Sequence, residues 1–194
     1  MKRVISGAIG IPLVLGLVLY GSPLLFFCFV VAVVAIASYE YFSMIANMGV
    51  EGYQIEGGVL GFILLVGFYL GAKFLGIFAV LLPVVLFTTW FVRGKNISVA
   101  LDPIAYTLLG IIYTAGLGGY FILIRDLDGG SQIIIFLLLL VWAGDVAAYY
   151  GGRNFGKHKL LPLVSPNKTV EGGIANILGT LLAAGLASLW FFEE

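Results

Sequence analysis

The sequence is poor in charged residues, cysteine and histidine. Ten Lys or Arg and ten Asp or Glu leave the 194-residue chain 10% charged, with a formal net charge of zero, whereas a soluble domain carries about 25% charged residues. This scarcity excludes an ordinary water-soluble domain, and the lack of a positive balance argues against a nucleic acid as partner. The one cysteine, Cys28, excludes an internal disulfide.

Most of what is present is apolar. Hydrophobic residues make up 61% of the chain, and the mean hydropathy is +1.12. The apolar runs are long and lack strict alternation, so helices and not barrel strands are expected to cross the bilayer. The predicted fold class is therefore all-α: a polytopic membrane protein with about seven transmembrane helices, forming a single domain over residues 1–194.

Turns and polar loops divide the apolar runs into the expected spans. Met1-Lys2-Arg3 resembles the start of a secretory signal, but no Ala-x-Ala cleavage site follows, so the first run is interpreted as a membrane helix. Pro23 favours the start of the second helix, and a loop is expected at residues 93–96. The expected spans cover residues 4–20, 24–43, 57–72, 74–92, 103–124, 132–151 and 166–192.

The basic residues predict how the chain is oriented. If the N-terminus is cytoplasmic, only Lys73 and Arg125 of the ten Lys and Arg fall on the outside. Such a bias follows the rule that basic loops stay in the cytoplasm. We therefore expect an integral protein of a cell membrane (the bacterial inner membrane), with its N-terminus and the polar segment 152–169 on the cytoplasmic side.

Asp145 lies near the end of an apolar helix, where an ionised carboxylate costs about 2.5–3.5 kcal/mol on insertion scales. Such a residue needs a cation, a metal ion or a water-filled cavity. Tyr149 follows one turn later on the same face, and small residues around Asp145 leave room for a ligand or a second helix. The structural alternative is an ion pair with Arg153 or Lys168.

Residues 151–157 have the G-x-x-x-x-G-K frame of a phosphate-binding P-loop. We reject that motif because His158 stands where Ser or Thr should follow the lysine, and because the frame follows a membrane helix and not a strand. The segment is interpreted as a glycine-broken helix end and a cationic loop. In it Arg153, Lys157 and Lys159 attract phosphate or contact lipid headgroups, while His158 lacks a partner cluster.

The run from Ser165 to Glu171 combines signals of a helix start with polar groups. Ser165 fits an N-cap and Pro166 a first helical residue, and capping alone could explain both. A helix N-terminus also attracts anions. Lys168, Thr169 and Glu171 would add a charge, a hydroxyl and a carboxylate there, a combination that suits a metal-bound phosphate.

Small residues at helical spacing follow this run. They predict close packing of the last helix against the helix at 132–151. They are Gly172, Gly173, Asn176, Gly179 and Ala183.

The order W-x-x-D-x-x-A-Y-Y-x-G-R-x-F-G-K, followed by S-P-x-K-T-x-E-G-G, resembles the phosphatidate cytidylyltransferases (CDP-diacylglycerol synthases). Earlier spans match that family only in general character. The matching residues are Trp142, Asp145, Ala148, Tyr149, Gly152, Arg153, Gly156, Lys157, Ser165, Pro166, Lys168, Thr169, Glu171, Gly172 and Gly173.

The resemblance implies a magnesium-dependent reaction of CTP with phosphatidate that yields CDP-diacylglycerol and pyrophosphate. It makes Asp145, Lys168 and Arg153 the expected catalytic residues, with Asp145 also a ligand of Mg²⁺. CTP, phosphatidate and membrane lipids are the expected partners, and a homodimer through small-residue faces is a further expectation. The expected substrate-binding residues are Ser165, Pro166, Thr169, Glu171, Lys157 and Tyr149.

Members of the family continue through further helices to a second signature, S-x-x-K-R-x-x-x-x-K-D and then H-G-G-x-x-D-R-x-D, which carries most of their metal-binding aspartates. This sequence contains no such signature. We therefore expect a fragment or a truncated member that is inactive by itself.

Three other functions fit part of this pattern. A transporter or channel subunit would distribute polar groups along several helices, whereas the charges here gather at one face. A CTP-dependent lipid kinase of the dolichol or phytol type shares the cytoplasmic-loop chemistry but releases CDP and not pyrophosphate. A purely structural membrane protein leaves the run from Ser165 to Glu171 unexplained.

Overall fold

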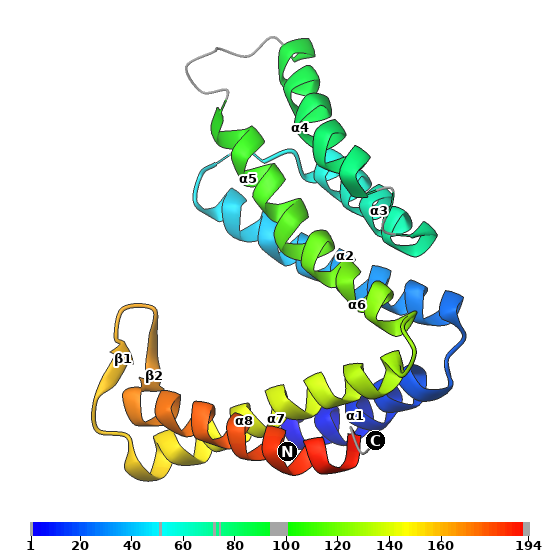
Figure 1. The fold of residues 1–194 in the computed structure, drawn as a ribbon. Coiled ribbons are helices and arrows are strands. Elements are labelled where there is room, and N and C mark those ends of the chain that lie inside the picture. Colours follow the sequence, from blue (N-terminus) through cyan, green and yellow to red (C-terminus); the bar gives the residue numbers. More distant parts are fainter. Residues whose placement is uncertain (1, 51, 72, 74, 94–100, 192–194) are drawn as a thin grey trace. The chain divides into compact units, whose positions relative to one another are not determined.

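The computed structural model describes residues 2–50, 52–71, 73, 75–93 and 101–191. Backbone contacts divide the chain into two compact units, residues 1–128 and 129–194 (Figure 1). Because compactness alone does not establish that a unit folds by itself, the single domain over residues 1–194 stays a prediction.

The first unit consists of helices. They are α1 (Lys2–Tyr20), α2 (Pro23–Asn47), α3 (Gln54–Leu70), α4 (Leu75–Val92), α5 (Leu101–Ile111), the π-helical segment η3 (Ile112–Gly116) and α6 (Leu117–Arg125). Helix α2 begins as expected, because Pro23 is in its first turn and the Ser22 hydroxyl accepts the amide of Leu25 at 3.2 Å. The part of the expected 93–96 loop beyond Arg93, and residues 72, 74 and 192 of the expected spans, lie outside the described residues.

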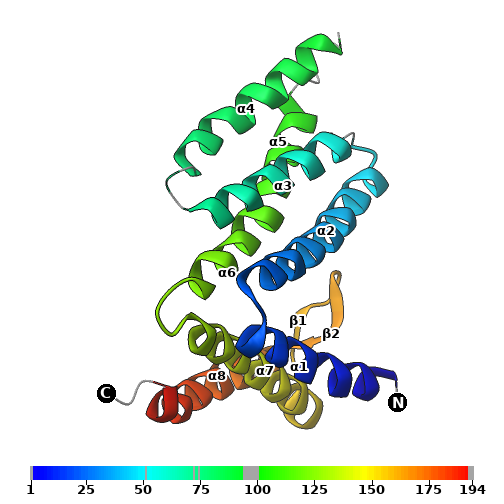
Figure 2. The same ribbon diagram turned by 90° about the vertical axis from the view of Figure 1, so that its right-hand side faces the viewer.

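The core of the first unit lies where α2, α3 and the α5–α6 helix meet (Figure 2). Side chains such as Phe42, Leu65 and Ile111 are buried there. Polar side chains also join the helices: the hydroxyls of Ser38 and Thr114 lie 2.8 Å apart. Apolar burial and satisfied hydroxyls together therefore fix these helices against each other.

The π-helical segment was not predicted. Thr114 lies within it, and its hydroxyl donates to the carbonyl of Gly110 at 2.7 Å. This bond supplies a donor to a backbone carbonyl where the regular helical ladder is interrupted. The helix nevertheless continues, so residues 101–125 form one apolar rod of 25 residues.

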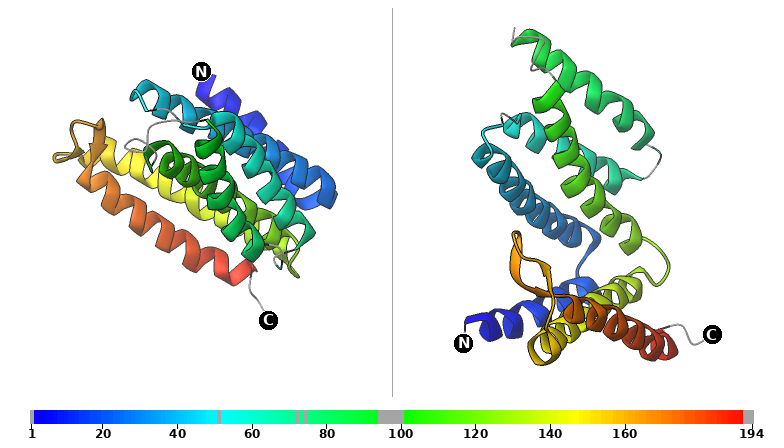
Figure 3. Two further views of the ribbon diagram at one scale, coloured as in Figure 1. Left: turned by 90° about the horizontal axis from the view of Figure 1, so that it is seen from above. Right: turned by 90° about the vertical axis from the view of Figure 1, so that its left-hand side faces the viewer.

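The second unit is a pair of antiparallel helices joined by a β-hairpin (Figure 3). It comprises α7 (Gly130–Phe155), β1 (Lys159–Leu161), β2 (Ser165–Thr169) and α8 (Val170–Phe191). In the antiparallel hairpin Lys159 is opposite Thr169 and Leu161 is opposite Ser165. The sequence predicted no strand, so the hairpin is a local addition to an otherwise helical fold.

The expected spans correspond to helices, and the chain is an all-α polytopic integral membrane protein. In the described part of the chain, five helices are long and apolar enough to cross a bilayer: α2, α4, the α5–α6 rod, α7 and α8. The apolar helices Gly10–Tyr20 and Gln54–Leu70 are shorter. The second of these corresponds to the expected span at residues 57–72.

Candidate functional site at the junction of α7, the hairpin and α8

Small residues let α7 and α8 approach closely. A Cβ atom added to Gly151 would collide with the Cβ of Ala175, and one added to Gly179 would collide with the Cβ of Ala147. At Gly172 the added atom would lie 3.0 Å from the carbonyl oxygen of α7 residue 148. The predicted close packing against α7 is therefore confirmed at Gly172 and Gly179, whereas it is wrong at Gly173, where an added Cβ would have nothing within 4 Å.

Helix α8 begins four residues later than predicted. Its N-terminal cap is Thr169, whose buried hydroxyl accepts the amide of Gly172 at 3.1 Å. Ser165 and Pro166 instead belong to β2, so their prediction as N-cap and first helical residue was wrong. The physical reason is that residues 165–169 form backbone hydrogen bonds with β1 when they are extended. A proline is tolerated there because β2 is an edge strand.

Lys168 consequently lies in β2 and not in the first turn of a helix. It is exposed, and its ammonium group makes no hydrogen bond or ion pair with a described residue. Lys159, in contrast, donates to the carbonyl of Pro166 across the hairpin at 2.7 Å. Lys168 is therefore free to bind an external anion.

Glu171 ties the start of α8 to the start of β1. Its carboxylate accepts the backbone amide of Lys157 at 3.1 Å and that of His158 at 3.3 Å, and it lies 2.6 Å from Nδ1 of His158. The sequence did not predict this pairing of His158 with Glu171. Thirteen positions separate the two residues, and only closure of the hairpin brings them together.

Asp145, Tyr149 and Arg153 follow one another at four-residue spacing and form an exposed ridge along α7. Arg153 donates from Nη1 to the Tyr149 hydroxyl at 3.1 Å. The structure shows no hydrogen bond or ion pair between the Asp145 carboxylate and any described residue, so the alternative of an ion pair with Arg153 or Lys168 is not formed. The carboxylate oxygens of Asp145 are therefore available to bind a ligand.

Four basic residues occur at the C-terminal end of α7 and in the hairpin that follows it. From residue 152 to residue 170 the sequence has no Asp or Glu. Arg153, Lys157, Lys159 and Lys168 are all exposed there. Such a group of cations, two helical turns from a carboxylate that has no hydrogen-bond or ion-pair partner among the described residues, is suited to binding a polyphosphate together with a divalent cation.

The described residues contain no group of three or more His, Cys, Asp and Glu that could hold a metal ion. Asp145 by itself offers one hard oxygen donor. Mg²⁺ usually keeps several waters and takes one or two carboxylates plus substrate phosphates. Asp145 therefore fits an Mg²⁺ ion that arrives with a nucleotide, although it does not form a closed metal site.

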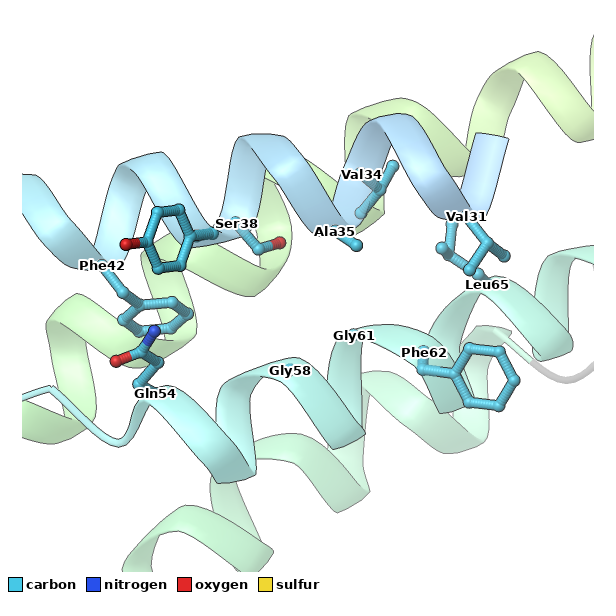
Figure 4. Close-up of a pocket in the computed structure, with 11 residues that line it drawn as sticks. Val31, Val34, Ala35, Ser38, Phe42, Gln54, Gly58, Gly61, Phe62 and Leu65 are labelled. Carbon is cyan, nitrogen blue, oxygen red and sulfur yellow. The ribbon is translucent and has the colours of Figure 1, made fainter. Parts of the chain in front are cut away.

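The first unit contains a separate cavity of about 240 Å³ between α2 and α3 (Figure 4). Its wall is mainly apolar, with Ser38 and Gln54 among its polar members, and none of its lining residues is charged. None of the site residues predicted from the sequence lies there. A triphosphate would therefore find no counter-charge among the residues that line this cavity.

A model of the Cytidylyltransferase family matches residues 1–194. The chain belongs to this family. It is 30% identical over 201 residues to a phosphatidate cytidylyltransferase of Bacillus subtilis (strain 168), which covers 97% of this chain and 71% of that protein. No solved structure matches.

Two staphylococcal members of the cytidylyltransferase family match over shorter stretches. The phosphatidate cytidylyltransferase of Staphylococcus saprophyticus is 41% identical over 91 residues, which are 47% of this chain and 34% of that protein. The one of Staphylococcus aureus (strain COL) is 37% identical over 102 residues, 53% of this chain and 38% of that protein. The resemblance found in the sequence motifs is thereby confirmed at the level of the family.

Proposed function

We propose that the protein is a phosphatidate cytidylyltransferase that transfers CMP from CTP to phosphatidate. Its membership of the family and the names of its relatives support this reaction over lipid phosphorylation and transport. The observation that carries the proposal concerns Asp145 and Lys168, neither of whose charged groups has a hydrogen-bond or ion-pair partner among the described residues. Asp145 lies on the ridge that ends at Arg153, and Lys168 lies in the hairpin that follows. A triphosphate and a lipid phosphate both need such counter-charges.

In the proposed reaction a phosphate oxygen of phosphatidate forms a bond to the α-phosphorus of CTP. The bond from that phosphorus to the oxygen bridging to the β-phosphate breaks, and pyrophosphate leaves with the electron pair. Positioning and neutralisation of negative charge supply most of the catalysis in reactions of this type. Arg153, Lys157 and Lys168 would bind the phosphates, and Tyr149 orients Arg153 through its hydroxyl.

Asp145 is the residue proposed to hold Mg²⁺, which neutralises phosphate charge and orients the triphosphate when bound. Glu171 is proposed to position the amide and side chain of Lys157, because its carboxylate already accepts hydrogen bonds from residues 157 and 158. It stays a prediction that substrate directly contacts Glu171, Thr169, Ser165 and Pro166. The homodimer also stays a prediction.

The location of the site matches the two substrates. Phosphatidate is anchored in a leaflet and CTP is dissolved in water, so they meet only at a membrane surface, and the hairpin joins the ends of two spanning helices. We propose that this surface faces the cytoplasm of a bacterial cell, with the N-terminus on the same side, because the basic residues follow the positive-inside rule.

The reaction is tested with the complete protein encoded by the reading frame that contains this sequence. In detergent micelles with CTP, phosphatidate and Mg²⁺, we expect pyrophosphate and CDP-diacylglycerol in equal amounts. A lipid kinase would instead release CDP and phosphorylate a lipid alcohol. CDP without pyrophosphate, or no product with phosphatidate, would contradict the proposed reaction.

The magnesium assignment predicts the behaviour of Asp145→Asn. Loss of the anionic ligand should reduce kcat by about a hundredfold or more and raise the Mg²⁺ concentration needed for half-maximal rate. Asp128→Asn, which changes an exposed aspartate outside the junction, is the matched control and should leave both unchanged. If the rate and the Mg²⁺ dependence of Asp145→Asn equal those of the wild type, Asp145 is not a metal ligand.

A further inference from the structure

The tip of the β-hairpin presents large apolar side chains to its surroundings. Leu163 is fully exposed, and Val164 is 80% exposed. Leu160 and Leu161 are about half-exposed in the adjoining strand. Exposed leucines on the spanning helices are explained by lipid tails, but the tip is outside any span, and a cluster of this kind marks an interaction surface.

The direction of the hairpin brings this tip near the bilayer. In the second unit the hairpin leaves the ends of α7 and α8 sideways, across the helix axes, and does not continue along them (Figures 1 and 3). When α7 and α8 cross a membrane, the hairpin therefore runs along the membrane surface. A strand rise of about 3.3 Å per residue carries residues 162–164 roughly 10–15 Å away from the helix pair, over neighbouring lipids.

The charges around the apolar tip have one sign. Lys157, Lys159 and Lys168 are exposed on the hairpin and its base, Arg153 is exposed in the last turn of α7, and no carboxylate occurs between residues 152 and 170. Apolar side chains flanked by Lys and Arg bind a bilayer interface by burying apolar surface and attracting anionic headgroups. The bond from Lys159 to the carbonyl of Pro166 braces the two strands.

We propose that the hairpin tip, residues 160–164, inserts into the boundary between headgroups and acyl chains of an anionic leaflet. The apolar side chains enter the lipid, and the positive charges of Lys157, Lys159 and Lys168 attract the anionic headgroups. The hairpin is thereby a lipid-binding element that lies beside the spans. This surface does not depend on the proposed reaction, since it rests on the exposure, direction and charge of the hairpin alone.

The test measures the depth of a nitroxide spin label at the tip. Cys28→Ala removes the one cysteine, and Leu163→Cys provides the labelling site in the full chain, reconstituted in vesicles of phosphatidylcholine with or without phosphatidylglycerol. Collision rates with oxygen, which concentrates in lipid, and with a water-soluble nickel complex report the depth. The matched control is Asp128→Cys, in an exposed turn.

We expect the oxygen-to-nickel ratio at position 163 to exceed that at position 128 several-fold and to rise further when phosphatidylglycerol is present. The triple variant Lys157→Gln, Lys159→Gln, Lys168→Gln should lose the dependence on phosphatidylglycerol. Equal ratios at both positions would overturn insertion. Low collision rates with both reagents at position 163 would also overturn it, since they would show that the tip is covered by protein. Insertion that is equal in both lipid compositions would overturn the anionic preference.

Discussion

Lys168→Ala in the complete protein is expected to reduce kcat by at least about a hundredfold, the usual loss when a group that stabilises developing charge is removed. Lys168 is exposed in β2, and its ammonium group makes no hydrogen bond or ion pair with a described residue. Its removal therefore takes a positive charge from the junction without breaking a bond that holds the fold. Steady-state rates of pyrophosphate release, with the amount of folded protein in membranes determined in parallel, measure the effect.

Asn167→Ala is the matched control for Lys168→Ala. It truncates the preceding exposed residue of the same strand and should retain wild-type turnover. If Lys168→Ala instead lowers the amount of folded protein while the rate per folded molecule stays unchanged, Lys168 is a structural residue. The proposed role in catalysis would then be wrong.

Gly179→Ala is expected to destabilise the α7–α8 pair by about 1–3 kcal/mol, the range for overpacking a close contact. The added methyl group would collide with the Cβ of Ala147, and the carbonyl oxygen of Ala143 would lie 3.4 Å from it. The helices must separate to admit it. The midpoint of thermal unfolding in detergent should fall accordingly.

Gly185→Ala provides the matched control on the same helix. A Cβ atom added at Gly185 has nothing within 4 Å, and replacing a helical glycine by alanine is worth up to about 1 kcal/mol in favour of the helix. Gly179→Ala should thus lower the midpoint of thermal unfolding, whereas Gly185→Ala should raise it or leave it unchanged. Equal destabilisation by both would show that the close approach of α7 and α8 does not contribute to stability.

The membrane helices could be predicted from the sequence because bilayer thickness imposes long apolar runs. The ends of the helices were harder to predict. Gly151 and Gly152 were interpreted as the end of a helix, yet α7 continues to Phe155. The two glycines serve the approach of α8, since Gly151 faces Ala175 and Gly152 lies against Gly172, and a tertiary contact of this kind has no local signal.

The residues of the junction were predictable as a set, whereas their arrangement was not. Ser165 and Pro166 carry signals that suit a helix start and an extended strand equally. The choice was decided by pairing with residues 159–161, which lie across a turn. The hydrogen bonds between Glu171 and His158 depend on that same pairing. Local sequence signals therefore predicted neither the strand nor these hydrogen bonds.

The length of α7 has a consequence for where the two substrates meet. Its 26 residues extend over about 39 Å, because each residue adds about 1.5 Å, and thus exceed a hydrocarbon layer of about 30 Å. Arg153, two residues before the end of the helix, can therefore stand among the headgroups, while Asp145 lies about 12 Å deeper along the axis. In the proposed site, the phosphate of a leaflet-bound phosphatidate would lie near the level of Arg153. CTP would have to descend from the water to reach an Mg²⁺ ion at Asp145, so the proposal requires a hydrated path along the ridge down to Asp145.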